Sequence, residues 1–287
     1  MARSKQYQIG IDVGGTKIAS VLLHQNKVVE HSTLATPTDS LQHFLIMIQA
    51  SLDPLMSIIE ANHGTLTGIG LGIPGVVDYE KDEVSIAPNL TLLNKVKLPE
   101  EIKKILGKPE LTVKMDNDVN CFVRAEALLG AGKKSSNVYG MTIGTGIGSG
   151  WYFKGEVYNG HHGGANEVGH MIVDFDELIT LEQAYHKLTQ HNPKLLAEEA
   201  YRGDVLAEKS FAELGAYLGI ALSTIVNILD PEIIILGGRV IDSGNLFLDT
   251  AKDNLKKYTF SPNAQSVRLV KGKLGPLAGA TGAGLLA

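Results

Sequence analysis

Residues that could handle phosphate occur near the start of the chain, in Ile9–Lys17, which reads I-G-I-D-V-G-G-T-K. An apolar, strand-like segment here carries Asp12 and then turns at Gly14, Gly15 and Thr16. Glycines let backbone N–H groups approach a phosphate closely, the threonine adds a hydroxyl, and Asp12 could hold a hydrated Mg²⁺. A plain hairpin turn, whose glycines only supply positive φ angles, explains the same residues. On this run alone both interpretations stay open.

Two more glycine-bearing turns follow strand-like segments, Asn137–Ile143 and Glu232–Leu236. These turns hold, in order, Gly144, Thr145 and Gly146, and then Gly237 and Gly238. One such turn is a weak sign of phosphate binding, because turns demand glycine anyway. Several together, two of them with threonine, favour a nucleotide site. The chain has no GxxxxGK[ST] run, and a strand rather than a helix is expected after Gly144–Gly150, so neither a P-loop nor a dinucleotide fingerprint is indicated.

Polar residues that suit a hydroxyl-bearing substrate form two further groups. Asp118 stands where an apolar segment ends and a helical one begins, a position typical of a helix N-cap. The same position suits a base that takes a proton from an attacking hydroxyl, with Asn117 hydrogen-bonding to neighbouring hydroxyls. Glu167 and His170, three residues apart among glycines, are either a solvated loop pair or donors and acceptors for a polyhydroxylated ligand.

The elements that would position these residues predict an α/β protein. Residues 7–73 read as three strands, a helix and a fourth strand, and Leu41–Ala61 carries the helical spacing of apolar residues. Asp204–Leu229 reads as one long amphipathic helix that stops at Asp230-Pro231. A mixed sheet with helical cover follows from this order, with a boundary between two lobes near Asp116.

The composition excludes several classes of protein. A chain of 287 residues is long enough for two cores. The net charge of −5 and the dispersed lysines and arginines argue against a nucleic-acid partner. A single cysteine, Cys121, excludes a disulfide framework or a thiolate cluster within one chain. The N-terminus does not read as a signal peptide, and no apolar run is seen to approach the ~20 residues of a membrane span, so we expect a cytoplasmic protein without a membrane partner.

Six short motifs occur in order along nearly the whole chain: D-V-G-G-T-K at 12–17, G-I-P-G at 72–75, D-N-D-V-N at 116–120, G-T-G-I-G at 144–148, E-V-G-H at 167–170 and I-L-G-G at 235–238. Together they resemble the ROK family (repressors, open reading frames and kinases) of bacterial sugar kinases. The resemblance implies a two-lobed α/β fold similar to actin and hexokinase, with ribonuclease H-like cores and ATP in the cleft. It also implies a homodimer formed through the second lobe. We expect one lobe to comprise 1–116 plus 275–287 and the other 117–274.

The resemblance also assigns roles by position. Asp118 matches the catalytic base, and Asn117 matches a sugar-binding asparagine. The other positions that would approach the sugar are Gly75, Asn89, Glu167, His170 and Glu182. The positions that would contact ATP, with Asp12 also near Mg²⁺ through water, are Asp12, Gly14, Gly15, Thr16, Gly144, Thr145, Gly146, Gly237 and Gly238.

One segment departs from the family pattern. Many members carry a cysteine-rich zinc loop, C-x-C-x4-C, after the E-x-G-H motif, whereas Asp174–Thr180 here is short and has no cysteine. Without thiolates His170 and scattered carboxylates cannot form the tetrahedral structural site, so no zinc is expected and His170 would serve the sugar alone.

The expected activity is ATP-dependent phosphorylation of a primary hydroxyl of a hexose. Glucose is favoured, and N-acetylmannosamine, N-acetylglucosamine, fructose and allose stay open. A non-catalytic sugar-sensing protein is the alternative from another class. The family's repressors add an N-terminal helix–turn–helix domain, for which we expect no room because the phosphate hairpin starts at residue 7.

Overall fold

The computed structural model describes residues 4–287, which form two compact units. The first unit comprises residues 4–130, Asn159–Ala165 and Leu274–Ala287. The second comprises Ala131–Tyr158 and Asn166–Lys273.

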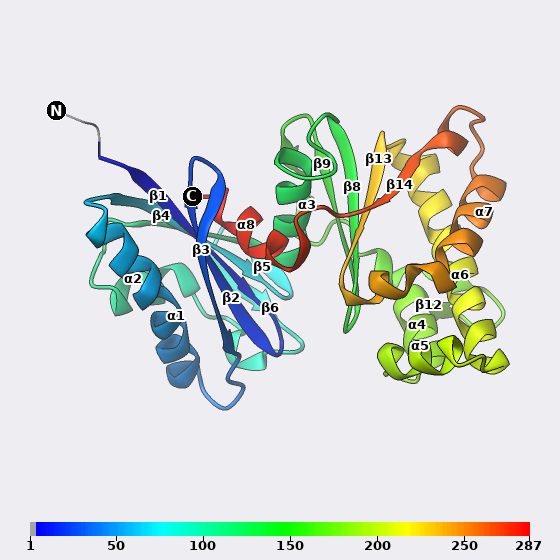
Figure 1. The fold of residues 1–287 in the computed structure, drawn as a ribbon, viewed down its shortest axis with the longest axis horizontal. Helices are drawn as coiled ribbons and strands as arrows, with labels where there is room; N and C mark the ends of the chain where they lie inside the picture. Colours follow the sequence, from blue (N-terminus) through cyan, green and yellow to red (C-terminus); the bar gives the residue numbers. More distant parts are fainter. Residues whose placement is uncertain (1–3) are drawn as a thin grey trace. The chain divides into compact units, whose positions relative to one another are not determined.

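The first unit is built on a five-stranded sheet with the order β3-β2-β1-β4-β7, of which Figure 1 labels β1, β2, β3 and β4. β1 pairs antiparallel with β2, and β2 pairs antiparallel with β3, whereas β4 runs parallel to β1 and β7 runs parallel to β4. The carboxyl ends of β1, β4 and β7 therefore meet at one edge of this sheet. The strands span Gln6–Val13 (β1), Lys17–His24 (β2), Lys27–Ala35 (β3), Thr65–Ile73 (β4) and Thr112–Asn117 (β7).

The two faces of this sheet pack against different helices, as the alternation along β2 shows. Ile18 and Leu22 belong to the core that contains residues of α1 (Leu41–Ala61), whereas Val21 and Leu23 pack with residues of α8 (Ala278–Gly284). Successive side chains of a strand point to opposite faces, so α1 and α8 lie on opposite sides of the sheet. The remaining elements of the unit are the hairpin β5 (Val76–Asp78) and β6 (Glu83–Ile86), α2 (Leu98–Ile105) and α3 (Asp118–Leu128).

Helix α8 lies directly on the sheet because β1 and β4 have glycines beneath it. A Cβ atom added to Gly10 would lie 1.9 Å from the carbonyl oxygen of Ala280, and one added to Gly70 would lie 1.7 Å from that of Ala283. A Cβ added to Gly282 of α8 would lie 1.7 Å from the carbonyl oxygen of Cys121 in α3. Backbone therefore meets backbone along α8, with no space for a side chain at these glycines.

The packing of α3 on α8 shifts the division of the chain away from the expected one. We expected the first lobe to end at residue 116, but the first unit continues through α3 to Gly130 and also takes in Asn159–Ala165. The physical reason is the close contact between α3 and α8, which are separated by about half of the sequence. The C-terminal part begins at Leu274, one residue before the expected position.

The second unit repeats the strand order of the first, as β10-β9-β8-β13-β14. β8 and β9 are antiparallel, as are β9 and β10, whereas β13 runs parallel to β8 and β14 runs parallel to β13. The strands span Asn137–Ile143 (β8), Ile147–Phe153 (β9), Glu156–Val157 (β10), Ile233–Gly237 (β13) and Arg268–Lys271 (β14). In both units the third, second, first, fourth and fifth strands thus lie in that order, which is the ribonuclease H-like arrangement. The expected α/β fold class is confirmed.

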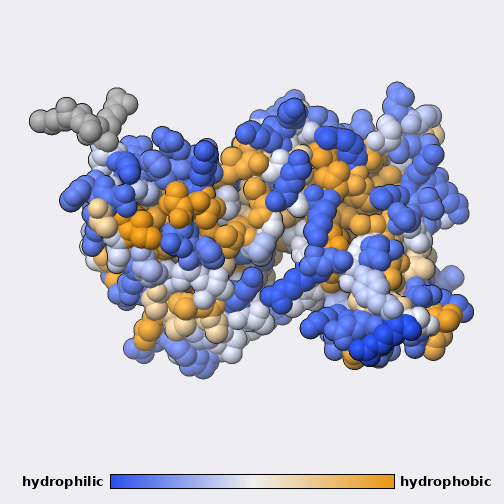
Figure 2. Space-filling view, in the orientation of Figure 1, coloured by the Kyte–Doolittle hydropathy of each residue, from blue (hydrophilic) through white to orange (hydrophobic). Residues whose placement is uncertain are grey.

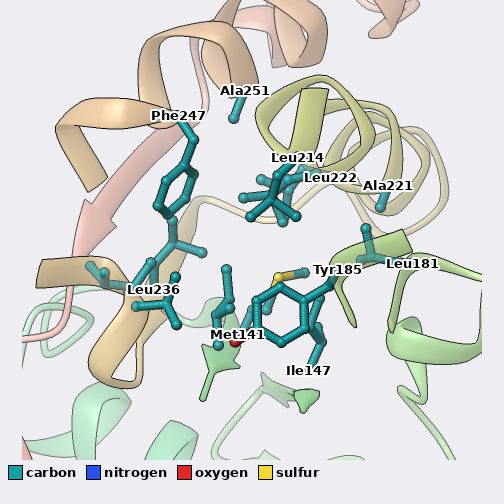
Figure 3. Close-up of a cluster of buried hydrophobic side chains, with 14 of the residues drawn as sticks. Met141, Ile147, Leu181, Tyr185, Leu214, Ala221, Leu222, Leu236, Phe247 and Ala251 are labelled. Atoms are coloured by element: carbon teal, nitrogen blue, oxygen red, sulfur yellow. The ribbon is translucent and has the colours of Figure 1, made fainter. Parts of the chain in front are cut away.

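Helices cover the second sheet over a large apolar core (Figure 3). Met141 and Leu236 from the sheet face Leu214 and Leu222 from α6, and Phe247 fills the space toward α7. The helices of this unit are α4 (Leu181–Thr189), α5 (Pro193–Tyr201), α6 (Val205–Leu229) and α7 (Leu248–Tyr258). A short hairpin, β11 (Ile172–Asp174) and β12 (Ile179–Thr180), precedes α4.

Helices α1 and α6 are long and apolar enough to cross a membrane by length and composition alone. This differs from our expectation that no run approaches that length. In the structure, each helix buries part of its apolar residues in the core of its unit, among them Leu52 of α1 and Leu222 of α6. Hydrophobic residues also reach the surface between hydrophilic ones (Figure 2), so exposure of single apolar side chains is ordinary here.

The backbone contact at Gly70 predicts a large loss of stability on Gly70→Ala. The added methyl group would meet the backbone of α8, which cannot move aside as a side chain can. We expect the free energy of unfolding to fall by roughly 3 kcal/mol. Gly164→Ala is the matched control, because a Cβ there meets nothing within 4 Å, and it should change stability by less than about 0.5 kcal/mol. Urea unfolding of both variants measures this, and equal stabilities would contradict the packing described.

Candidate active site

The first glycine turn is held in place by the end of β3 and the residue after it. The N–H of Gly14 donates to the carbonyl oxygen of Lys17 (2.9 Å), which closes the turn between β1 and β2. Thr36 donates its hydroxyl to the carbonyl oxygen of Gly14 (2.7 Å) and its N–H to that of Thr16 (3.2 Å). Gly15 and Thr16 are exposed at the tip. The turn at Gly14–Thr16 is therefore fixed by hydrogen bonds at its base and exposed to solvent at its tip.

Asn89 lies close to this turn although it is far away in sequence. A Cβ atom added to Gly15 would meet only the Cβ of Asn89, at 4.0 Å. Asn89 itself is exposed. The structure therefore places a residue that we predicted to approach the sugar beside residues that we predicted to approach phosphate.

The Asp12 carboxyl is surrounded by protein with little positive charge to balance it. Burial raises the pKa of Asp12 to about 6, and the positive charge of Lys17 acts in the opposite direction. Gly279 of α8 packs against it so closely that an added Cβ would lie 2.6 Å from a carboxyl oxygen. A divalent cation would favour the ionised carboxylate, so this residue fits the role of a magnesium-side ligand.

Helix α3 begins at the second polar group, and its N-cap is Asn117 rather than Asp118. The Oδ1 atom of Asn117 accepts hydrogen bonds from the N–H groups of Val119 (2.8 Å) and Asn120 (3.2 Å). Its Nδ2 atom donates to the carbonyl oxygen of Gly75 (3.0 Å). Asp118 is the first residue of the helix, so the N-cap interpretation of this aspartate was wrong. Asn117 also holds Gly75 in place, which joins two predicted sugar positions.

Asp12 and Asp118 approach the same face of the sheet. Asp12 on β1 is the register partner of Gly72 on β4, so both point to the same face. A Cβ atom added to Gly72 would lie 3.4 Å from the Cα of Asp118 and 3.3 Å from the Sγ of Cys121. The start of α3 thus lies against the row that contains Asp12. Cys121 is fully buried there, and burial raises the pKa of its thiol.

A buried carboxylate beside the start of α3, that of Asp116, was not predicted from the sequence to have a role in the site. Asp116 accepts hydrogen bonds from the Tyr79 hydroxyl (2.6 Å), from Arg124 (2.6 Å) and from the Asn120 amide (2.9 Å). It also accepts from the N–H of Asn117 (2.8 Å), directly beside the N-cap. The only sequence signal was an arginine eight residues after an aspartate, too weak to use, because the tyrosine comes from a separate loop.

In the second unit, the turn after β8 is open on its outer side. The N–H of Gly144 donates to the carbonyl oxygen of Gly146 (2.9 Å), and the Tyr185 hydroxyl donates to the carbonyl oxygen of Gly144 (2.6 Å). A Cβ added to Gly144 would meet nothing within 4 Å. A ligand could approach this backbone as closely as glycine permits, and Thr145 supplies a hydroxyl within the same turn.

The third turn lies next to the second. Gly237 on β13 is the register partner of Thr142 on β8. Gly238 has a φ angle of +86°, and a Cβ there would lie 2.1 Å from the carbonyl oxygen of Ile143, so only glycine fits. Because β8 and β13 are parallel, both turns stand at the same edge of the second sheet.

Three predicted sugar contacts gather beside the second turn. Glu182 is the second residue of α4, and its Oε2 atom accepts from the N–H of Ile147 (2.6 Å). A Cβ added to Gly169, between Glu167 and His170, would lie 3.4 Å from this carboxylate. Partial burial raises the pKa of Glu167, with His170 lowering it and Glu182 raising it further, so the three side chains are electrostatic neighbours.

Within each unit, then, the predicted residues come together at the edge formed by the carboxyl ends of parallel strands or beside the turns there. The first unit holds Asp12, Gly14, Gly15, Thr16, Gly75, Asn89, Asn117 and Asp118. The second holds Gly144, Thr145, Gly146, Glu167, His170, Glu182, Gly237 and Gly238. The edge of such strands is the usual ligand-binding position in open α/β sheets. Among residues 4–287, no three His, Cys, Asp or Glu side chains gather as metal ligands would.

The paired ribonuclease H-like units, with glycine turns and carboxylates at their sheet edges, define a protein of the hexokinase-like sugar kinase class of folds. The model of the ROK family matches residues 8–287, and the chain therefore belongs to the ROK family.

Named relatives cover nearly the whole chain. It is 28% identical to "Glucokinase" of Streptomyces coelicolor, over 97% of this chain and 96% of the relative. This chain is also 28% identical to "Xylose repressor" of Bacillus subtilis, over 96% of this chain and 75% of the repressor. It is 28% identical to "N-acetyl-D-glucosamine kinase" of Vibrio cholerae, over 96% of this chain and 98% of that enzyme. Among solved structures, a ROK family glucokinase from Streptomyces griseus in complex with glucose and AMPPNP superposes with a TM-score of 0.79 at 27% identity, over 98% of this chain and 99% of that one.

The raised pKa of Asp12 predicts that Asp12→Asn stabilises the protein at neutral pH. Between pH 3.8 and about 6 the folded state binds more protons at this carboxyl than the unfolded state, so its contribution to stability falls as pH rises through that window. Asparagine cannot ionise, so the variant should gain up to about 3 kcal/mol at pH 7.5 and little at pH 4. Urea unfolding at the two pH values measures this.

Asp53→Asn, on the exposed side of α1, is the control and should shift stability little at either pH. A loss of stability in Asp12→Asn at pH 7.5 would mean that the attraction to Lys17 outweighs the burial of the charge.

Proposed function

We propose that this protein is an ATP-dependent sugar kinase that phosphorylates a primary hydroxyl of a hexose. The observation that carries the proposal is the placement of Asp118 at the start of α3, beside the Asn117 cap and on the sheet face of Asp12. Membership of the ROK family and the kinases among its relatives support the reaction class.

The ATP side of the reaction is assigned to backbone rather than to cationic side chains. In this proposal the turns at Gly14–Thr16 and Gly144–Gly146 direct N–H groups and threonine hydroxyls at phosphate oxygens, and Gly237 and Gly238 approach the adenosine. The AMPPNP bound to the relative from Streptomyces griseus supports ATP as the phosphoryl donor. Asp12 would hold Mg²⁺ through water, and the ion would supply positive charge for the oxygens of the transferred group.

The sugar side is assigned to Asn117, Asp118 and the cluster around Glu167. Asn117 uses one N–H of its amide to hold Gly75, and its other N–H can donate to a sugar hydroxyl. The Asp118 carboxylate takes the proton of the primary hydroxyl as that oxygen forms a bond to the γ-phosphorus. The bond from the γ-phosphorus to the bridging oxygen of ADP breaks at the same time. Because such transition states are loose, most of the rate should come from positioning and charge stabilisation.

Glucose is the favoured substrate of the proposal because relatives named as glucokinases include one solved with glucose bound. An N-acetylhexosamine such as N-acetylmannosamine is the alternative, and the N-acetyl-D-glucosamine kinase of Vibrio cholerae supports that class. We further propose a cytoplasmic homodimer with no nucleic-acid or membrane partner, on the family resemblance and on the net charge of −5.

A non-catalytic sugar-sensing protein is the second candidate, favoured by the similarity to the xylose repressor of Bacillus subtilis. A sensor needs to bind the sugar but has no use for a magnesium-side carboxylate and a base on one sheet face. The presence of both Asp12 and Asp118 favours the kinase.

A coupled assay for ADP release across a panel of sugars separates these candidates. We expect glucose to give the highest kcat/KM among glucose, fructose, allose, N-acetylglucosamine and N-acetylmannosamine, with ATP and Mg²⁺ present. A preference for an N-acetylhexosamine would support the alternative substrate class. Sugar binding by calorimetry without ADP release from any member of the panel would favour the sensor.

Removal of the proposed base should abolish turnover and spare binding. We expect Asp118→Asn to lower kcat by about 10³-fold or more, because the amide cannot accept the proton, while the Kd for the sugar changes by less than about threefold. Asp249→Asn makes the same change in the first turn of α7, on an exposed carboxyl, and should leave both values unchanged. Near-normal turnover in Asp118→Asn would overturn the assignment.

A further inference from the structure

The segment that departs from the family pattern joins two predicted sugar contacts. His170 ends a short 3-10 helix, and the hairpin of β11 and β12 then leads directly to Glu182 at the start of α4. The N–H of Leu181 donates to the carbonyl oxygen of Met171 (2.8 Å), which closes the base of the hairpin. Whatever fixes this hairpin therefore fixes both His170 and Glu182.

The hairpin residues do not fit a zinc ion. There is no cysteine in 172–180, and the Glu177 carboxylate pairs with Lys187. Both oxygens of Asp174 accept hydrogen bonds from protein donors, so this carboxylate is already held within the protein. Across residues 4–287 no group of three possible ligands comes together. The residues of this hairpin therefore do not offer the set of ligands that a structural zinc ion needs.

Asp174 instead forms a hub of hydrogen bonds at the turn of the hairpin. Its Oδ1 atom accepts from the N–H groups of Asp176 and Glu177, both at 3.0 Å. Its Oδ2 atom accepts from the hydroxyl of Tyr217 on α6 at 2.8 Å. The two backbone bonds shape the turn, whereas the bond to Tyr217 ties that turn to a helix of the core.

The hydrogen bond between Asp174 and Tyr217 matters because only the base of the hairpin is packed in the core. Val173 is buried in the core, and Met171 and Ile179 are partly buried against it. The tip, by contrast, is exposed, with Phe175 at 79% and Leu178 at 66% exposure. A tip that is not packed needs a specific interaction to fix its position, and Asp174 with Tyr217 supplies one.

The far end of the hairpin is fixed by a capping box. Thr180 accepts from the N–H of Gln183 (3.3 Å), and the Gln183 side chain accepts from the N–H of Thr180 (2.9 Å). This starts α4 at a defined residue and aims Glu182 at the N–H of Ile147. Between Asp174 and Glu182 the chain therefore contains only the tip of the hairpin, the short strand β12 and the N-cap and first residue of α4.

We infer that Asp174 and Tyr217 are a positioning pair that acts, without a metal ion, on the segment between His170 and Glu182. The pair fixes the segment between His170 and Glu182 and thereby sets the affinity for the sugar. This inference rests on the proposed sugar kinase activity and names the residues that tune its sugar site.

Tyr217→Phe tests the pair by removing a single hydroxyl. We expect KM for the sugar to rise about three- to tenfold, while kcat and KM for ATP stay within about twofold. The reason is that the substitution weakens contacts to the bound sugar but does not affect the proposed base, Asp118. Tyr201→Phe is the matched control, since the Tyr201 hydroxyl donates to Asn245 (2.7 Å) in the same unit, away from the hairpin, and it should leave all three values unchanged. Asp174→Asn, which keeps an acceptor for the tyrosine, should raise KM less than Asp174→Ala.

Amide hydrogen exchange of the ligand-free protein gives a readout that needs no activity. Peptides covering 171–181 should exchange faster in Tyr217→Phe than in the wild type or in Tyr201→Phe. Exchange equal to that of the wild type would overturn the inference, as would a lower Tm with an unchanged KM for the sugar. If the wild type phosphorylates no sugar, the proposed function falls, and the exchange result still decides whether the pair holds the segment.

Elemental analysis and chelation complete the test. We expect purified wild-type protein to contain far less than one zinc per chain and to keep its KM for the sugar after incubation with a strong chelator. One zinc per chain, or a KM that rises on chelation, would show that a metal holds the segment and would overturn the inference.

Discussion

The candidate site of the first unit depends on the absence of side chains along one face of β1 and β4. Gly10 and Gly70 let the backbone of α8 rest on the sheet, because a Cβ atom at these positions would lie 1.9 Å and 1.7 Å from carbonyl oxygens of α8. The start of α3 lies against the same face at Gly72, where an added Cβ would be 3.4 Å from the Cα of Asp118. Gly72 is also the register partner of Asp12, so Asp118 lies beside the row that contains Asp12.

The two carboxylates on this face, Asp116 and Asp12, differ in how far the protein compensates their charge. Asp116 is buried at 1% exposure and accepts four hydrogen bonds, one of them from Arg124, so its charge is compensated. Asp12 has Lys17 as its balancing charge, and burial raises its pKa to about 6. A carboxylate that the fold does not satisfy is one that a ligand or cation can satisfy.

Local patterns made the turns and the helices predictable, because strand ends, glycines and caps are encoded within a few residues. The family motifs then supplied the fold class. What failed depended on partners far away in sequence. The lobe boundary was placed before α3 because its contact with α8 has no local signal.

The repeated strand order explains why the two units contribute different chemistry. In the first, Asp12 of β1 pairs in register with Gly72 of the next parallel strand. In the second, Thr142 of β8 pairs in register with Gly237, so the glycine edge is kept while the carboxylate is replaced. An edge of glycine turns and hydroxyls suits phosphate and nucleotide, whereas carboxylates are needed for a metal ion and for proton removal. The two units thus carry different residues at matching register positions, Asp12 in the first and Thr142 in the second.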